Sequence, residues 1–176
     1  MGRVLWWLAC GIAAALILPS VAQAQSGIMI SGVRPELHGG IGWHGDIGFG
    51  GRVDIPVAPN GFIDGVNDEF ALSPGGEIYF DDYHGHGPGD HDGDFYFAGV
   101  FTPQWNFYVS PQWSVFPELG LALIFFGHDH GPNDDDHAHL DLDLIFAFGG
   151  RYHWSTRNSL VMRLSWPFGL QIGVTF

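Results

Sequence analysis

Histidine and aspartate are concentrated in two short stretches of the sequence. The first runs from His84 to Asp94 and reads HGHGPGDHDGD, and the second runs from His128 to His139 and reads HDHGPNDDDHAH. Neutral imidazole is a good ligand for Zn²⁺, Cu²⁺ and Ni²⁺, and carboxylate oxygens suit harder ions such as Ca²⁺. The composition therefore predicts divalent-metal binding, with the candidate ligands His84, His86, Asp90, His91, Asp92, Asp94, His128, Asp129, His130, Asp134, Asp135, Asp136, His137 and His139.

The spacing of these histidines supports a shared ligand set. Three H-x-H pairs occur, and in an extended segment the side chains at i and i+2 point to the same side. Neither the HExxH pattern of zinc proteases nor the full EF-hand pattern is present. Two alternatives remain open. The stretches are solvated acidic loops without a bound ion, or they form a pH sensor, because imidazole groups titrate together near mildly acidic pH.

Apolar residues alternate with small or polar residues along eight segments of the sequence. In the last segment Phe168, Leu170, Ile172, Val174 and Phe176 share one side. A period of two is typical of a β-strand that has one apolar face. The predicted strands are Val33–Trp43, Ile47–Val57, Phe70–Phe80, Phe95–Val109, Val115–Phe125, Leu140–Tyr152, Leu160–Ser165 and Phe168–Phe176.

The charged residues of these segments fall on the side opposite the bulky apolar residues. An even number of strands of about ten residues, apolar outside and polar inside, is typical of a membrane β-barrel. The sequence therefore predicts an all-β, eight-stranded antiparallel transmembrane barrel with up-and-down meander topology. A soluble, lipocalin-like ligand-binding barrel is the alternative, and it would turn its apolar face inward. The charged residues predicted to face the interior are Arg34, Glu36, Arg52, Asp54, Glu77, Glu118, Asp141, Asp143, Arg151 and Arg163.

The first 24 residues have the pattern of a secretory signal peptide. Arg3 precedes the apolar run Val4–Leu18, and Ala22-Gln23-Ala24 forms an A-x-A cleavage site. The apolar run is shorter than the roughly 20 residues that a transmembrane helix needs. We therefore expect a signal peptide over residues 1–24 and a barrel domain over residues 25–176.

These features together resemble the small bacterial outer-membrane β-barrels of the OmpA/OmpX type. The resemblance rests on the signal peptide, the eight alternating segments and a last segment that ends in Phe176. It implies a place in the bacterial outer membrane, contact with membrane lipid and lipopolysaccharide, and recognition of the segment ending in Phe176 by the barrel assembly machinery. Two features depart from the pattern: the connection Ala58–Glu69 is long for a periplasmic turn, and Trp166-Pro167 is short for an outer loop.

The expected topology places both His/Asp-rich stretches on the extracellular side, because connections alternate between the two ends of a meander barrel. We expect a barrel that displays these loops and binds divalent metal ions. The alternatives are a narrow channel and a structural or adhesion barrel without a metal function. We expect little conductance, because side chains fill the interior of an eight-stranded barrel. The sequence predicts no oligomeric state.

Composition and histidine placement bear on the remaining function classes. The formal net charge is −13, and all six basic residues are arginine. Such a chain does not neutralise phosphates, which argues against nucleic-acid binding. Outside the two stretches, His38 and His44 are predicted to face inward and His153 to face outward. None has an evident serine partner at a matched height on the same face, so we expect no catalytic site and no enzyme.

Overall fold

The computed structural model describes residues 32–58, 61–80, 95–127 and 139–176. The predicted signal peptide lies outside these residues. In the described part of the chain, no helix is long and apolar enough to cross a membrane. The described residues form eight strands: β1 (Arg34–Ile41), β2 (Ile47–Ala58), β3 (Asp68–Phe80), β4 (Phe95–Tyr108), β5 (Trp113–Gly127), β6 (His139–His153), β7 (Ser159–Trp166) and β8 (Gly169–Thr175).

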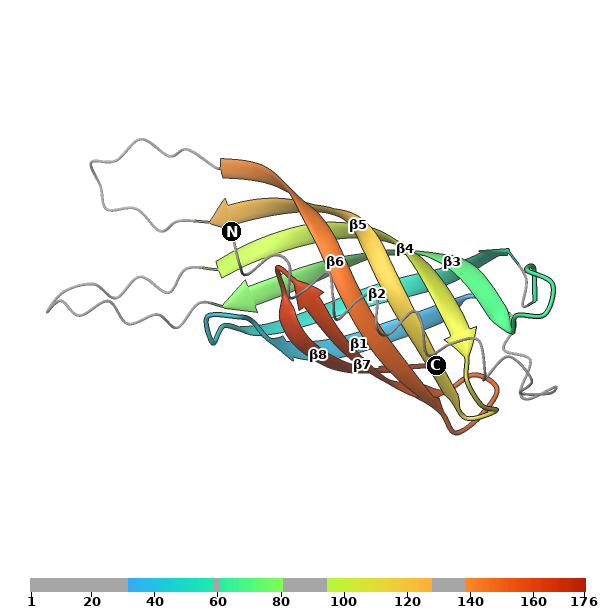
Figure 1. The fold of residues 1–176 in the computed structure, drawn as a ribbon. Helices are drawn as coiled ribbons and strands as arrows, with labels where there is room; N and C mark the ends of the chain where they lie inside the picture. The colour runs from blue at the N-terminus through green and yellow to red at the C-terminus, as the bar shows by residue number, and fades with distance from the viewer. Residues whose placement is uncertain (1–31, 59–60, 81–94, 128–138) are drawn as a thin grey trace, which may run out of the picture.

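The eight strands close into a barrel of meander topology (Figure 1). Each strand pairs antiparallel with the next, and β1 pairs antiparallel with β8, where Leu37 lies opposite Val174. Closure leaves every strand with a neighbour on both sides, which a membrane-spanning sheet requires because lipid cannot hydrogen-bond the backbone. The predicted fold class and strand order are confirmed.

The start of β8 differs from the prediction. The alternating pattern predicts a strand that starts at Phe168, with the Phe168 ring facing outward like Leu170. Instead β8 begins at Gly169, which has a φ of 76°, and the Phe168 side chain is fully buried. The turn reverses the chain here, and a positive φ suits glycine because it has no Cβ. A period-of-two pattern does not detect such a reversal, so Phe168 is placed on the wrong face by the sequence.

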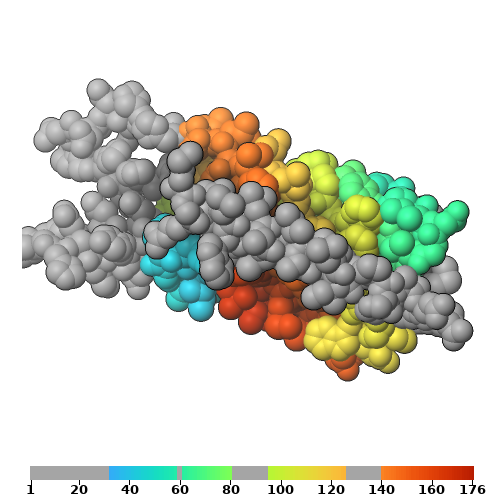
Figure 2. All heavy atoms as spheres, viewed as in Figure 1, coloured from blue at the N-terminus to red at the C-terminus, as the bar shows by residue number. Residues whose placement is uncertain are grey.

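The barrel is apolar outside and polar inside. On β6 the outward residues Leu142 and Phe148 are 64% and 54% exposed, whereas the inward Arg151 is buried. Side chains of β4, β5 and β6 lie against one another along the upper side of the space-filling view (Figure 2). A soluble barrel would have the opposite polarity, because its apolar residues would form the core. The lipocalin-like alternative is therefore wrong.

The two ends of the barrel differ in what they carry. One end holds the first residue of β1, Arg34, and the last residue of β8, Thr175; we call it the terminal rim. The other end holds Phe80, Phe95, Gly127 and His139, the strand ends that border residues 81–94 and 128–138; we call it the loop-bearing rim. Figure 1 shows these strand ends together on the left.

Candidate functional site

The lumen is filled by charged side chains that come from six strands. They alternate with outward apolar residues, so each inward position of a strand adds one side chain to the interior. Eight of the ten charges predicted to face inward are buried there: Arg34, Glu36, Arg52, Asp54, Glu77, Glu118, Arg151 and Arg163. Placing opposite charges together allows each to be paired, which a buried charge requires.

Two arginines at the centre of the lumen share one carboxylate. Arg52 Nη1 donates to Glu118 Oε2 at 2.9 Å, and Arg163 Nε donates to Glu118 Oε1 at 3.1 Å. Arg52 also pairs with Glu77 at 2.9 Å, and Arg163 Nη1 pairs with Glu36 at 2.8 Å. This central cluster links β1, β2, β3, β5 and β7 across the lumen, so it ties together strands that are not neighbours in the sheet.

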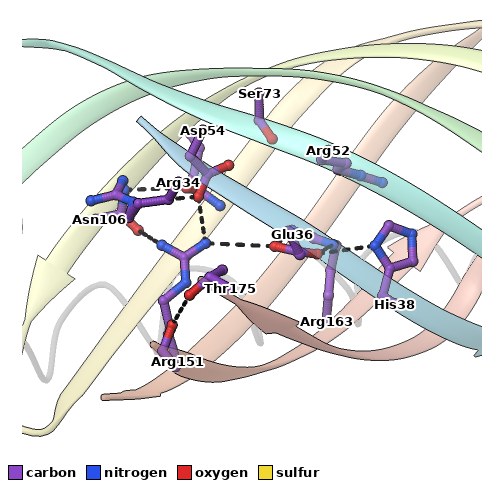
Figure 3. Close-up of polar contacts among 12 residues, drawn as sticks. Arg34, Glu36, His38, Arg52, Asp54, Ser73, Asn106, Arg151, Arg163 and Thr175 are labelled. Atoms are coloured by element: carbon purple, nitrogen blue, oxygen red, sulfur yellow. Dashed lines mark hydrogen bonds and ion pairs between the residues drawn. The ribbon is translucent and has the colours of Figure 1, made fainter. Parts of the chain in front are cut away.

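A second group of charges lies nearer the terminal rim (Figure 3). Arg151 Nη2 donates to Asp54 Oδ2 at 2.6 Å, and Arg151 Nη1 donates to Asn106 Oδ1 at 3.3 Å. Arg34 Nη1 donates to Glu69 Oε2 at 3.2 Å. The Phe116 ring lies 5.0 Å from the Arg151 guanidinium and 5.6 Å from that of Arg163, within cation–π range. The two groups therefore form one continuous network.

His38 connects two carboxylates within this network. Its Nδ1 lies 3.1 Å from Glu36 Oε1, and its Nε2 lies 2.7 Å from Glu77 Oε2. Both cross-strand neighbours of His38 are glycines, Gly50 on β2 and Gly173 on β8. A Cβ at Gly50 would lie 2.5 Å from His38 Nε2, and a Cβ at Gly173 would lie 2.6 Å from His38 Cβ. The two glycines thus make room for the imidazole.

Apolar residues close the lumen toward the loop-bearing rim. The Tyr79 ring stacks on Tyr96 with centroids 5.2 Å apart and on Phe168 at 5.7 Å. The Tyr79 hydroxyl donates to the Phe168 carbonyl at 2.8 Å. The buried residues packed around this stack are Ala98, Val100, Ala122, Ile124 and Ile145. A polar layer and an apolar layer therefore fill the interior in succession.

Two of the predicted interior charges do not join the network. Asp141 is exposed and Asp143 is half-exposed, although both share the inward side of β6 with Arg151. Their Oδ1 atoms accept the backbone N–H groups of Leu142 and Leu144, at 2.9 and 2.8 Å. The reason is that β7 accompanies β6 only as far as Phe146, so the lumen is not enclosed at this height. Alternation gives the side of the strand but not where the barrel wall ends.

The histidines outside the two stretches are placed partly as predicted. His38 faces inward, but His44 is exposed in the turn between β1 and β2. The predictions for His153 are wrong: its side chain is buried, and Nε2 lies 2.9 Å from Ser114 Oγ. The pairing arises because β5 and β6 bring both inward positions to the terminal rim. The Ser114 hydroxyl is fully buried, so this pair has no open approach for a substrate.

Uncharged polar residues also line the lumen, and the pattern of charged residues alone does not predict them. Gln104 donates to Glu118 Oε1 at 2.8 Å, and Gln171 donates to the Tyr79 hydroxyl at 3.2 Å. Glu69, the partner of Arg34, was also missed, because the predicted strand began one residue later at Phe70. Each of these residues has the inward parity of its strand. The same alternation, applied to every polar residue, would have found them.

The predicted metal ligands, with the exception of His139, lie outside the described residues. His139 is the first residue of β6. Among the described residues, no group of three or more His, Cys, Asp or Glu side chains is placed to hold a metal ion. The structure does define where the two stretches attach. Phe80 pairs with Phe95, Phe95 pairs with Gly127, and Phe126 pairs with His139, so the attachment points are neighbours on one rim.

Comparison with known proteins identifies the fold but not a family. No family model matches the chain, and no curated protein matches it. Neisserial surface protein A (NspA) is 13% identical, with a TM-score of 0.52 over 81% of this chain and 92% of that one. A designed transmembrane β-barrel is 12% identical, with a TM-score of 0.50 over 88% and 98% of the two chains. Ail of Yersinia pestis, crystallised with the heparin analogue sucrose octasulfate, is 8% identical, with a TM-score of 0.48 over 81% and 90%.

The fold and the polarity of the wall lead to the same conclusion. The designed barrel and NspA share the closed architecture of this chain, and the outward face here is apolar on every strand. An apolar exterior around a charged interior is stable in a bilayer and not in water. The chain therefore has the fold of the small transmembrane β-barrels, with the apolar exterior and charged interior that the sequence predicted.

Proposed function

We propose that the protein is a closed outer-membrane anchor that presents two His/Asp-rich segments on the cell surface, where they bind divalent metal ions. The supporting observation is the placement of the attachment points. Residues 81–94 join β3 to β4 and residues 128–138 join β5 to β6, and these four strands are consecutive in the wall. Thirteen of the fourteen candidate ligands thus belong to segments that join adjacent strands of the barrel, and the fourteenth, His139, is the first residue of β6.

The filled lumen favours an anchor over a narrow channel. The charge network crosses the interior at its centre. The stack of Tyr79, Tyr96 and Phe168 lies between this network and the loop-bearing rim. An open path would require several buried ion pairs to separate, and each would leave uncompensated charge. A rigid barrel of this kind can hold variable surface segments without changing its own structure.

Bound cations would also connect the protein to its surroundings. Lipopolysaccharide is anionic, and the two segments are rich in aspartate. A divalent ion ligated by carboxylate and imidazole groups can keep open positions for phosphate oxygens. Cation-mediated contact with lipopolysaccharide is therefore the partner interaction that we propose for the two segments.

Metal binding is tested by calorimetric titration of the refolded protein in detergent with Zn²⁺, Ni²⁺, Cu²⁺ and Ca²⁺. We expect stoichiometric binding of at least one ion. A variant with the seven histidines of the two stretches changed to serine should lose the Zn²⁺, Ni²⁺ or Cu²⁺ signal, because imidazole supplies the ligands for these ions. His44→Ser is the matched control, since His44 is exposed on the same rim in a different turn.

Equal, weak binding by the wild type and the seven-histidine variant would contradict the metal function. The protein would then be a structural or adhesion barrel whose segments contact a partner without an ion. Loss of binding in His44→Ser as well would make His44 a required ligand and would contradict a site formed by the two segments alone.

We also propose that the outward face of β8 is recognised during barrel assembly. Leu170, Ile172, Val174 and Phe176 are all about half exposed on this face, and Phe176 N donates to Pro35 O at 3.1 Å. Phe176→Ser should lower the amount of heat-modifiable, folded barrel in the outer membrane, because the apolar row is interrupted at its end. Phe176→Tyr is the control that keeps an aromatic ring. Normal assembly of Phe176→Ser would contradict this role.

A further inference from the structure

The wall of the barrel is much taller on one side than on the other. Strands β5 and β6 have 15 residues each, whereas β7 has 8 and β8 has 7. Trp166, the last residue of β7, lies opposite Phe146, so within the described part of the chain residues His139–Ile145 of β6 have no strand partner on that side. Figure 1 shows the β7–β8 hairpin ending well short of the start of β6. The loop-bearing rim therefore has a notch above β7 and β8.

The difference in height is large compared with a bilayer. At about 3.3 Å per residue and a tilt of about 40°, a strand of 15 residues rises by roughly 38 Å and one of 8 residues by roughly 20 Å. The apolar band of an outer-membrane barrel is about 25 Å tall. A flat bilayer of uniform thickness therefore cannot match both sides of this barrel.

The outward face stays apolar to the top of the tall side. Leu140, Leu142 and Leu144 on β6 are 59%, 64% and 52% exposed, and Phe125 on β5 is 44% exposed. Leu140 lies directly opposite Phe125. These residues continue, without an intervening outward charge, the same apolar face that meets lipid lower on β5 and β6. Continuity with the lipid-facing surface indicates hydrocarbon as the occupant.

The free edge of β6 is also adapted to a position without a neighbouring strand. The N–H groups of Leu142 and Leu144 donate to the carboxylates of Asp141 and Asp143, at 2.9 and 2.8 Å. Backbone donors at a lipid boundary must be satisfied within the protein. An incoming strand would have to displace both carboxylates, so the capped edge disfavours a second copy or another protein as its partner.

Two exposed tryptophans lie at the end of the short side of the wall. Trp43 and Trp166 lie side by side at the tip of the wall, with ring centroids 6.3 Å apart, and both are about half exposed. Tryptophan is enriched at the level of the lipid headgroups. The polar boundary of the outer leaflet on this side is therefore close to Trp166, while the apolar face of β6 extends beyond this level.

We propose that the outer leaflet follows the uneven rim, so that hydrocarbon covers Leu140 and Leu142 and thins beside the β7–β8 hairpin. The partner of this surface is lipid, and the asymmetry makes the barrel a local perturbation of bilayer thickness. Bilayers accommodate apolar surfaces that are too short by thinning, at a modest cost for each ångström. This inference rests on the membrane barrel alone and is independent of metal binding.

Spin labels at two outward positions test the proposal. Cys10 is the only cysteine, so Leu142→Cys and Leu170→Cys are made in a Cys10→Ser background. Leu164 of β7 lies opposite both Leu170 of β8 and Phe148 of β6. Leu142 lies on β6 as well, closer to the loop-bearing rim than Phe148. The refolded full chain in phosphatidylcholine vesicles is probed for label accessibility to oxygen, which favours hydrocarbon, and to a water-soluble nickel chelate.

We expect both labels to be more accessible to oxygen than to the nickel chelate, and to report depths in the bilayer that agree within about 3 Å, the rise of one residue along a strand. Met162→Cys, an outward position lower on β7, serves as the hydrocarbon control, and Arg157→Cys, in the turn before β7, as the aqueous control.

A Leu170 label several ångströms deeper than the Leu142 label would show a flat, thick leaflet and would contradict the thinning beside the β7–β8 hairpin. A Leu142 label that favours the nickel chelate would show an apolar face in water, and dipolar broadening of that label would show a second copy on it. Either result would overturn the lipid assignment.

Discussion

Arg163→Met should lower the free energy of unfolding of the barrel by about 3–5 kcal/mol, the cost of removing one partner from a buried ion pair. Arg163 is completely buried and contacts two carboxylates, Glu36 at 2.8 Å and Glu118 at 3.1 Å. Methionine fills a similar volume but leaves Glu36 without its bidentate partner. The measurement is urea unfolding of the protein in lipid vesicles, followed by tryptophan fluorescence.

Two further variants isolate the cause of this loss. Arg157→Met changes an exposed arginine in the turn before β7 and should alter stability by less than about 0.5 kcal/mol. Arg163→Met combined with Glu36→Gln removes an uncompensated charge and should recover part of the stability, because a neutral amide is cheaper to bury than a carboxylate. A loss below about 1 kcal/mol in Arg163→Met would mean that water enters the lumen and solvates the carboxylates.

Phe148→Arg should lower the free energy of unfolding in lipid vesicles by about 2–4 kcal/mol, the cost of arginine near the middle of the membrane on the lipid face of a barrel. Phe148 faces outward, is 54% exposed and lies opposite Leu164 in the middle part of the wall. The exterior offers the guanidinium no partner, whereas an inward arginine only three residues away, Arg151, is paired with Asp54. The expected loss of stability therefore depends on which face of β6 carries the arginine, because the inward face supplies a carboxylate partner and the outward face does not.

The matched control is Phe148→Leu, which keeps the face apolar and should cost less than about 1.5 kcal/mol. The measurement is the same unfolding experiment, repeated in a zwitterionic detergent micelle, where the penalty should shrink because the micelle deforms around the charge. Equal stability of Phe148→Arg and the wild type in vesicles would place this face in water and contradict the membrane orientation of β6.

The strands themselves were predictable because alternation is a local property. The pairs Glu36–Arg52 and Ala147–Ser165 are inward neighbours because antiparallel strands place residues that face the same side of the sheet opposite each other. Shifting a strand by one residue would place its charges in lipid, so the register is strongly constrained. This constraint is why eight of ten interior charges were placed correctly without any knowledge of their partners.

The partners were not predictable, because they join residues far apart in the sequence. Arg163 and Glu36 are separated by 127 residues, and Arg151 and Asp54 by 97. Which inward residues meet depends on how the closed wall is tilted and staggered, and that is a property of all eight strands together. The contact between His153 and Ser114 was unpredictable for the same reason. The inward side of His153 was predictable, because His153 lies two residues after Arg151, but the predicted strand ended one residue earlier at Tyr152.

The sequence by itself determined the all-β barrel, the side of the wall on which nearly every strand residue lies, and the concentration of histidine and aspartate in two stretches. These follow from residue type and spacing, which act locally. The tertiary structure alone decided the pairing within the lumen, the inward turn of Phe168, the exposure of Asp141 and Asp143, and the notch above β7. Those features depend on where the wall closes and how high each strand rises, and closure is fixed only when β1 meets β8.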